Sequence, residues 1–284
     1  MKAVVKSILK TFCYVALFLG MQFIASFSVQ FVWGFKAGME SAASGVPIDS
    51  VAMTQELQAY LLENQNVILM ASGALTLLFL LVFFKCRKKN MGKELELGKL
   101  NPKMVLPIAV MGWSFSLLVC CVLNVIPLPE EVLQSYAESS QGIVEGNYFI
   151  RILATVVVIP IVEEVIFRGL IYTRMKKAMK VPVAIVFSGL VFGLMHGQIL
   201  WISYTFIGGI LFAVVMEKTK SLKASIVLHM ALNSVSAVLG EIEITGLAAY
   251  IVILVAIVLI VGALCYVLKS GDAEDVPEPR YEAV

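Results

Sequence analysis

Long apolar runs dominate this chain of 284 residues, of which 60% are hydrophobic. A helix needs roughly 20 predominantly apolar residues to cross the hydrocarbon core of a bilayer. Soluble domains contain only about 45–50% apolar residues, so the composition points the same way as the runs. We therefore predict an all-α integral membrane protein with about eight transmembrane helices. The expected spans are residues 11–33, 67–84, 104–126, 149–171, 182–197, 199–216, 224–240 and 247–268.

Positive charges lie in every second connection between these spans. The amino terminus, the 85–103 connection and the connections after the fourth and sixth spans are rich in Lys and Arg. By contrast, the 127–147 connection has four glutamates and no basic residue, and the 34–66 connection has only Lys36. Basic connections stay in the cytoplasm, so we expect a multi-pass cell-membrane protein with both termini cytoplasmic. This use of charge, with a net charge of only +2, argues against a nucleic-acid partner.

The chain divides into three parts by this pattern. Residues 1–147 hold the first three spans, residues 148–240 hold the polar motifs described below, and residues 241–284 hold the last span and an acidic tail that we expect to be disordered. The fifth span is short and is followed at once by Gly197 and Gln198. We expect it to end inside the membrane, where irregular backbone must be buried in protein or line a cavity. Pro160 predicts a kink that frees a backbone carbonyl inside the bundle.

Three polar clusters interrupt the apolar runs of the middle part, and together they hold both histidines of the chain. They are Glu163, Glu164 and Arg168; Phe192 and His196; and His229 and Asn233. Such groups are costly in hydrocarbon unless they are partnered, so polar residues at membrane depth indicate function by default. At about 1.5 Å per helical residue, all three clusters fall in the middle or the cytoplasmic half of the bilayer. We predict that they converge on one buried site.

Helical spacing assigns different positions to the two glutamates. Glu164 and Arg168 are four residues apart, so they share a helix face and can form an ion pair. Glu163 is rotated by about 100° from Glu164 and stays available to handle a proton. Two plainer interpretations remain open: both carboxylates could pair with arginine at a helix end, and each histidine could be a satisfied core residue.

Water activation fits this set of groups. Glu163 and His196 could polarise a water molecule for attack on a peptide carbonyl, and His229 and Asn233 could donate hydrogen bonds to the developing oxyanion. Alternatively, Glu163, His196 and His229 could hold a divalent metal such as zinc, which would lower the pKa of a bound water. The sequence does not choose between these schemes, although the absence of an HExxH motif excludes the usual zincin arrangement.

The ordered motifs Glu-Glu-xxx-Arg, Phe-xxx-His and His-xxx-Asn resemble the CPBP intramembrane proteases. This family includes the eukaryotic type II CAAX prenyl endopeptidases and the bacterial Abi proteins, some of which are linked to bacteriocin maturation or self-immunity. The resemblance covers about residues 148–240 and implies a CAAX-protease-like helical bundle. It implies that Glu163 is the catalytic glutamate, that His196 is its partner, and that His229 and Asn233 bind the oxyanion. Glu164 and Arg168 match the supporting positions of the first motif. The family is commonly called metalloprotease, although the glutamate–histidine water scheme needs no metal.

We therefore expect an intramembrane endopeptidase that acts on a peptide or membrane-protein substrate near the cytoplasmic half of the bilayer. A second class is a non-catalytic protein on the same fold, either a bacteriocin self-immunity protein or a regulator of membrane signalling. A third class, a proton-coupled transporter, is weakened because the sequence shows no paired repeat of interrupted helices.

Overall fold

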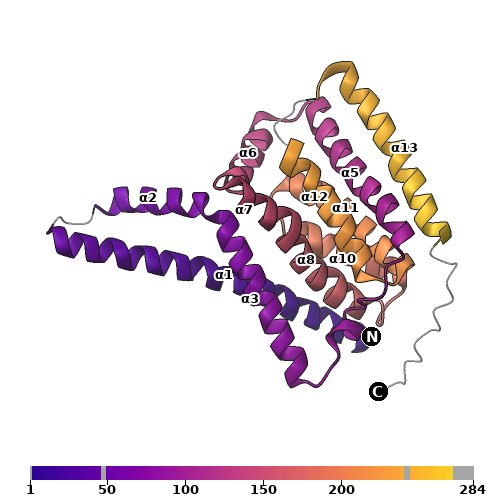
Figure 1. Ribbon diagram of the computed structural model, residues 1–284, viewed down its shortest axis with the longest axis horizontal. Coiled ribbons are helices and arrows are strands. Elements are labelled where there is room, and N and C mark those ends of the chain that lie inside the picture. The colour runs from indigo at the N-terminus through magenta and orange to yellow at the C-terminus, as the bar shows by residue number, and fades with distance from the viewer. Residues whose placement is uncertain (1, 46–48, 240–243, 271–284) are drawn as a thin grey trace.

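The computed structural model describes residues 2–45, 49–239 and 244–270, and all regular structure in these ranges is helical (Figure 1). The predicted all-α fold class is therefore confirmed. The acidic tail expected to be disordered lies in residues 271–284, outside the described part.

The α-helices are α1 (Lys2–Ser44), α2 (Ser50–Glu63), α3 (Gln65–Cys86), α4 (Met91–Glu94), α5 (Pro102–Val125), α6 (Glu130–Val144), α7 (Tyr148–Ile152), α8 (Ile159–Glu164), α9 (Thr173–Met175), α10 (Val181–Leu194), α11 (Ile199–Thr219), α12 (Leu222–Leu239) and α13 (Gly246–Ser270). Two π-helical segments, η1 (Leu153–Val158) and η2 (Val165–Tyr172), join α7, α8 and α9 into one continuous run. Inserted π-helical turns are often found at functional sites.

Five helices among the described residues are long and apolar enough to cross a membrane: α1, α3, α5, α11 and α13. Two other predicted spans coincide with the shorter apolar helices α10 and α12, and the span predicted at 149–171 is divided by η1 and η2. The count of eight spans therefore stays a prediction. The expectation of a short fifth helix is confirmed, because α10 has 14 residues and is only about 21 Å long.

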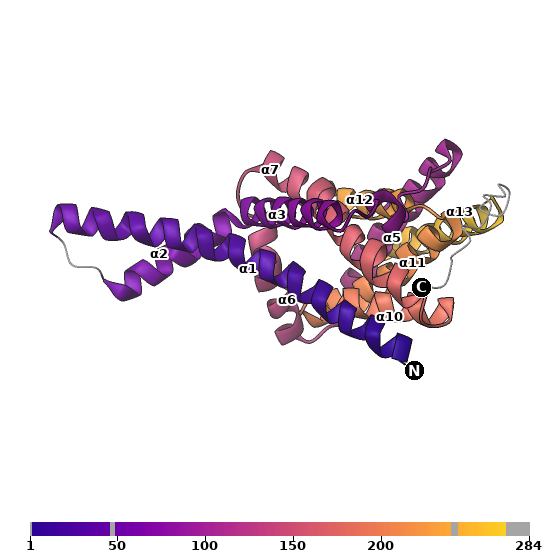
Figure 2. The same cartoon turned by 90° about the horizontal axis from the view of Figure 1, so that it is seen from below.

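Helices also occupy two connections for which the hydropathy pattern predicts no helix. The 34–66 connection contains the end of the 43-residue α1 and all of α2, which begins after Asp49. The Asp49 carboxylate accepts hydrogen bonds from the N–H groups of Val51 and Ala52, as N-cap residues do. The 127–147 connection contains α6. The α1–α2 hairpin projects from the other helices in both views (Figures 1 and 2).

Close backbone contact positions α12 in the bundle. A Cβ atom added at Gly112 of α5 would lie 2.5 Å from the carbonyl oxygen of Leu228 and 2.9 Å from the backbone nitrogen of Leu232. Only glycine allows two helices to approach this closely. Because Leu228 precedes His229, this contact sets the depth and rotation of the helix that carries the second histidine.

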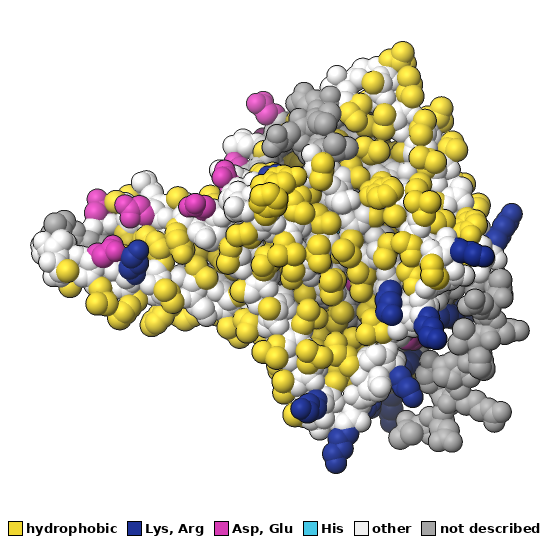
Figure 3. All heavy atoms as spheres, in the orientation of Figure 1, with side chains coloured by type: hydrophobic (Ala, Val, Ile, Leu, Met, Phe, Trp, Pro, Cys, Tyr) yellow, Lys and Arg dark blue, Asp and Glu magenta, His cyan; other side chains and the backbone are white. Residues whose placement is uncertain are grey.

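Charge is segregated on the surface shown in Figure 3. Lys and Arg side chains gather along its lower and right edges, Asp and Glu gather at the left and upper left, and hydrophobic side chains fill the area between them. A membrane protein with a basic end and an acidic end, separated by an apolar surface, has this distribution.

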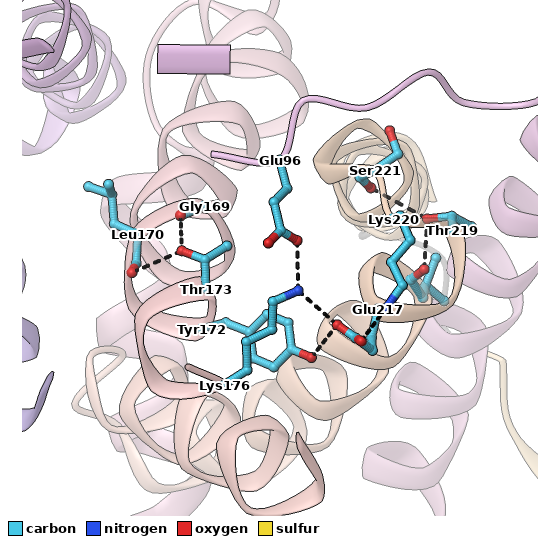
Figure 4. A network of polar contacts seen from close by, with 11 residues as sticks. Glu96, Gly169, Leu170, Tyr172, Thr173, Lys176, Glu217, Thr219, Lys220 and Ser221 are labelled. Atoms are coloured by element: carbon cyan, nitrogen blue, oxygen red, sulfur yellow. Dashed lines mark hydrogen bonds and ion pairs between the residues drawn. The ribbon is translucent and has the colours of Figure 1, made fainter. Parts of the chain in front are cut away.

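A network of polar contacts ties three segments together at the basic end (Figure 4). The ammonium group of Lys176, just after α9, lies 2.7 Å from a carboxylate oxygen of Glu96 and 2.9 Å from one of Glu217 in α11. The hydroxyl of Tyr172 donates to the same Glu217 oxygen at 2.8 Å. Burial alone would lower the pKa of Lys176, but the hydrogen bonds and negative charges of Glu96 and Glu217 outweigh it and raise that pKa above its ordinary value.

We expect Lys176→Met to lower the free energy of unfolding by about 1–3 kcal/mol. This range lies between the cost of losing an exposed ion pair and the cost of breaking a fully buried one. The folded-state pKa of Lys176 is raised, so its contribution is complete at neutral pH and disappears as the pH rises through that raised pKa. In thermal unfolding in detergent between pH 7 and 11, the difference in unfolding temperature between the wild type and Lys176→Met should therefore be largest at pH 7. Lys99→Met, at an exposed position of the same end, is the control. Equal unfolding temperatures for the two variants would contradict the prediction.

Candidate active site

A fully buried ion pair lies at the centre of the predicted site. The guanidinium Nη1 of Arg168 in η2 is 3.0 Å from the carboxylate Oε1 of Glu164 at the end of α8, and neither side chain is exposed. This is the ion pair that the four-residue spacing predicts. Charged groups without solvent need close partners, and the surroundings of Arg168 provide them.

Arg168 is surrounded by acceptors and aromatic faces. Its Nη2 donates to the carbonyl oxygen of Gly209 in α11 at 3.1 Å. Its guanidinium carbon lies 4.2 Å from the ring centre of Phe192 and 4.9 Å from that of Phe212, within the range of cation–π attraction. Arg168 therefore joins the α8–η2 run to α10 and α11.

His229 of α12 contacts both glutamates, each through a different ring nitrogen. Its Nδ1 lies 3.0 Å from Glu164 Oε1, and its Nε2 lies 3.7 Å from Glu163 Oε2. The side chain of Glu163 is 14% exposed, whereas that of Glu164 is fully buried. The face of the imidazole stacks on Phe212 at 4.7 Å between ring centres. The two adjacent carboxylates thus have separate environments, as their rotation on the helix predicts.

His196 lies two residues beyond the end of α10, and a backbone hydrogen bond fixes its tautomer. Its Nδ1 is 2.9 Å from the carbonyl oxygen of Phe192. A carbonyl oxygen only accepts, so Nδ1 carries the proton and Nε2 of the neutral ring keeps a free lone pair. The Phe192 ring contacts both imidazoles edge to face, with ring centres 4.9 Å from His196 and 5.8 Å from His229. The two histidines therefore border the same aromatic side chain.

Asn233 has a structural partner that follows from Pro160. The N–H of Ile159 bonds to the carbonyl of Ala154, five residues back. In this π-helical pattern the next N–H, from residue 160, would reach Thr155, but proline has none. The side-chain nitrogen of Asn233 donates to the Thr155 carbonyl instead, at 2.8 Å. The predicted free carbonyl is therefore present, and Asn233 uses one of its two donor hydrogens on it.

The residues do not form a metal centre. No group of three or more His, Cys, Asp or Glu side chains suited to a metal ion occurs in the described part of the chain. The Nδ1 atoms of His196 and His229 face protein oxygens, which leaves Nε2 as the remaining nitrogen of each ring. The alternative in which Glu163, His196 and His229 hold zinc is not supported by the positions of these side chains.

Glycines let α10 and α11 approach closely beside the site. A Cβ at Gly189 would lie 3.1 Å from the backbone nitrogen of Ile210, and one at Gly193 would lie 3.0 Å from the carbonyl oxygen of Ile202. These are two of the three glycines at four-residue spacing in α10 and the turn after it. The third, Gly197, has open space around it and a φ of +72°, so it forms a turn instead.

The spacing of the motifs does not predict that Trp201 and Gln198 belong to this region. The Trp201 ring meets His196 edge to face at 6.5 Å, and Gln198 is buried directly after the turn. Neither belongs to a motif pair at four-residue spacing. The only sequence signal is their place just after the short fifth span.

Gly209→Ala should disrupt the site, whereas Gly208→Ala should be tolerated. A Cβ at Gly209 would lie 2.9 Å from the Cα of Gly189 and 3.0 Å from Nη2 of Arg168, so α11 or the guanidinium must move. A Cβ at Gly208 would make an ordinary contact of 3.5 Å with the Phe115 ring. We expect the free energy of unfolding to fall by about 1–3 kcal/mol in Gly209→Ala and by less than about 0.5 kcal/mol in Gly208→Ala. Thermal unfolding in detergent measures both, and equal effects would refute the close contact.

Comparison with known proteins gives a match to one family. Neither a curated protein nor a solved structure matches the chain. A family model does match, and it supports a membrane-embedded protease of the CAAX type with peptide substrates. The resemblance predicted from the three motifs is confirmed, because residues 145–235, which contain every motif residue, match the Rce1-like type II CAAX prenyl endopeptidase family.

Proposed function

We propose that this protein is an intramembrane endopeptidase in which Glu163 and His196 activate a water molecule for attack on a peptide carbonyl. One observation carries the proposal. Glu164 and Arg168 neutralise each other in full burial, while the neighbouring Glu163 is free of that pair and partly exposed. A glutamate kept apart from a structural ion pair, beside the imidazole of His229, is suited to general-base work.

The proton positions follow from the hydrogen bonds. Glu164 Oε1 accepts from Arg168 and also accepts the Nδ1 proton of His229. The other ring nitrogen of His229, Nε2, lies 3.7 Å from Glu163 Oε2. A proton on Nε2 would be placed to be donated to a developing oxyanion.

The reaction then proceeds with balanced protons. Glu163 takes a proton from water while the lone pair on His196 Nε2 orients that water by accepting its other hydrogen. The water oxygen bonds to the carbonyl carbon, and the negative charge forms on the carbonyl oxygen, where His229 donates. The second side-chain hydrogen of Asn233 is available for the same oxygen. Glu163 then passes its proton to the leaving nitrogen as the peptide bond breaks.

The same proposal includes the orientation of the chain. In this proposal the basic end of the molecule faces the cytoplasm, and both termini are assigned to the same side from the distribution of Lys and Arg. Glu163 is eleven residues before Arg174, so it lies about 16 Å from the basic end along the helix. Cleavage would occur within the bilayer, on its cytoplasmic side.

We expect Glu163→Gln to reduce cleavage by about 10²–10⁴-fold, because it removes a general base and keeps the size of the side chain. Proteomics of membrane peptides from cells with the wild-type or the variant protein should reveal fragments that depend on Glu163. A quenched-fluorescence peptide ending in a farnesylated CAAX sequence, the substrate that the family description suggests, is the first candidate for purified protein.

Glu131→Gln, an exposed position on α6, is the matched control and should cleave at the wild-type rate. Both variants should accumulate in the membrane to the wild-type level. If the Glu163 variant yields the same fragments as wild type, the catalytic assignment is wrong, and a non-catalytic immunity or signalling role on the same fold takes its place.

A further inference from the structure

A tight turn places Gln198 directly beside the site. The chain leaves α10 at Leu194 and enters α11 at Ile199. Between them, the N–H of Gln198 donates to the carbonyl of His196 at 2.8 Å, with Gly197 at a φ of +72° in the centre of this three-residue turn. Any movement of the Gln198 backbone therefore moves His196 as well.

The Gln198 side chain is buried with one polar group unused. Only 8% of the residue is exposed. Its Oε1 accepts the N–H of Trp201 at 3.0 Å and so caps α11. This bond fixes the orientation of the carboxamide, because exchanging O and N would set an NH₂ group against an N–H donor. Its Nε2 is then left buried without a hydrogen-bond partner in the described structure. Such a group calls for a ligand, since an unpaired buried donor is costly.

Aromatic side chains pack around the turn that carries this donor. Trp201 packs against His196, and Tyr136 of α6 packs edge to face against Trp201 at 6.2 Å between ring centres. The residues that flank the turn, Leu194 and Ile199, are 57% and 59% exposed. A substrate chain arriving from the apolar surface would therefore pass this turn next to His196.

We propose that Gln198 is a substrate-binding residue whose Nε2 donates a hydrogen bond to a main-chain carbonyl of the peptide being cleaved. This inference rests on the proposed function and deepens it by naming a contact that positions the substrate. A main-chain carbonyl is the acceptor that any peptide segment brings into an apolar site, and a neutral carboxamide donates to it without adding a charge. Gln198 takes no part in the proton transfers. It would hold the chain in register with His196.

Gln198→Glu is the first variant, because it keeps an oxygen that caps α11 and replaces the amide donor with a carboxylate, at the cost of one added charge. The substrate is a synthetic peptide that spans the cleavage site of a Glu163-dependent fragment, assayed with full-length protein in liposomes. We expect KM to rise roughly tenfold, with kcat changed less than about threefold, the size expected for one lost hydrogen bond. The N-terminus of α11 offsets part of the cost of this charge, so the unfolding temperature should fall less than in the uncharged variant that follows. Gln198→Met, which lacks both donor and cap, should raise KM equally and also lower the unfolding temperature.

A set of peptides with single backbone esters identifies the acceptor, because an ester carbonyl accepts hydrogen bonds more weakly than an amide. One ester position should raise KM for the wild type and have no further effect in Gln198→Glu. A wild-type KM in the Gln198→Glu variant, or ester effects that are the same in both proteins, would show that Nε2 serves only a water or the fold. In that case, fragments that depend on Glu163 would still support the proposed protease function. If no fragment depends on Glu163, the proposed function fails and this inference falls with it.

Discussion

The arrangement of the site depends on one ion pair in complete burial, Glu164 with Arg168. Removing either partner of such a pair leaves an uncompensated charge and costs about 3–5 kcal/mol. The two charges also hold three helical segments in place, because Arg168 bonds to the backbone of Gly209 in α11 and Glu164 bonds to His229 in α12. The pair therefore works as a rigid centre against which His229 is positioned, and Phe192 contacts both imidazoles.

Local sequence spacing predicts the contacts made within one helix, and it predicts which backbone group a proline leaves without a partner. The four-residue interval predicts the Glu164–Arg168 pair, and Pro160 predicts a free carbonyl, which is that of Thr155. The pattern of apolar runs predicts the helical class and the shortness of α10. These features depend on helix geometry and on the missing N–H of proline, which the residues themselves determine.

Contacts between helices could not be predicted in the same way. A 3.6-residue period gives no sign of the π-helical η1 and η2, whose hydrogen bonds are tied to long-range packing such as the Asn233 contact. Hydropathy alone also misses α2 and α6, which are too polar to appear as spans. It gives eight apolar runs, whereas five helices in the described part of the chain are long and apolar enough to cross a membrane. The burial of Gln198 depends on the turn at Gly197 and on α11, so no motif indicates it.

A hydrolytic site within a bilayer must satisfy two opposed conditions. Its charges need a dry, tightly packed setting to be held rigidly, yet its nucleophile is water. In the proposed mechanism the adjacent glutamates divide these conditions between them: Glu164 is fully buried and ties helices together, whereas Glu163 is 14% exposed and faces Nε2 of His229. Moving the carboxylate by a single residue changes the direction of the side chain by about 100°, which is enough to separate a structural position from a reactive one. Adjacent acids on one helix therefore serve this site better than one acid required to do both tasks.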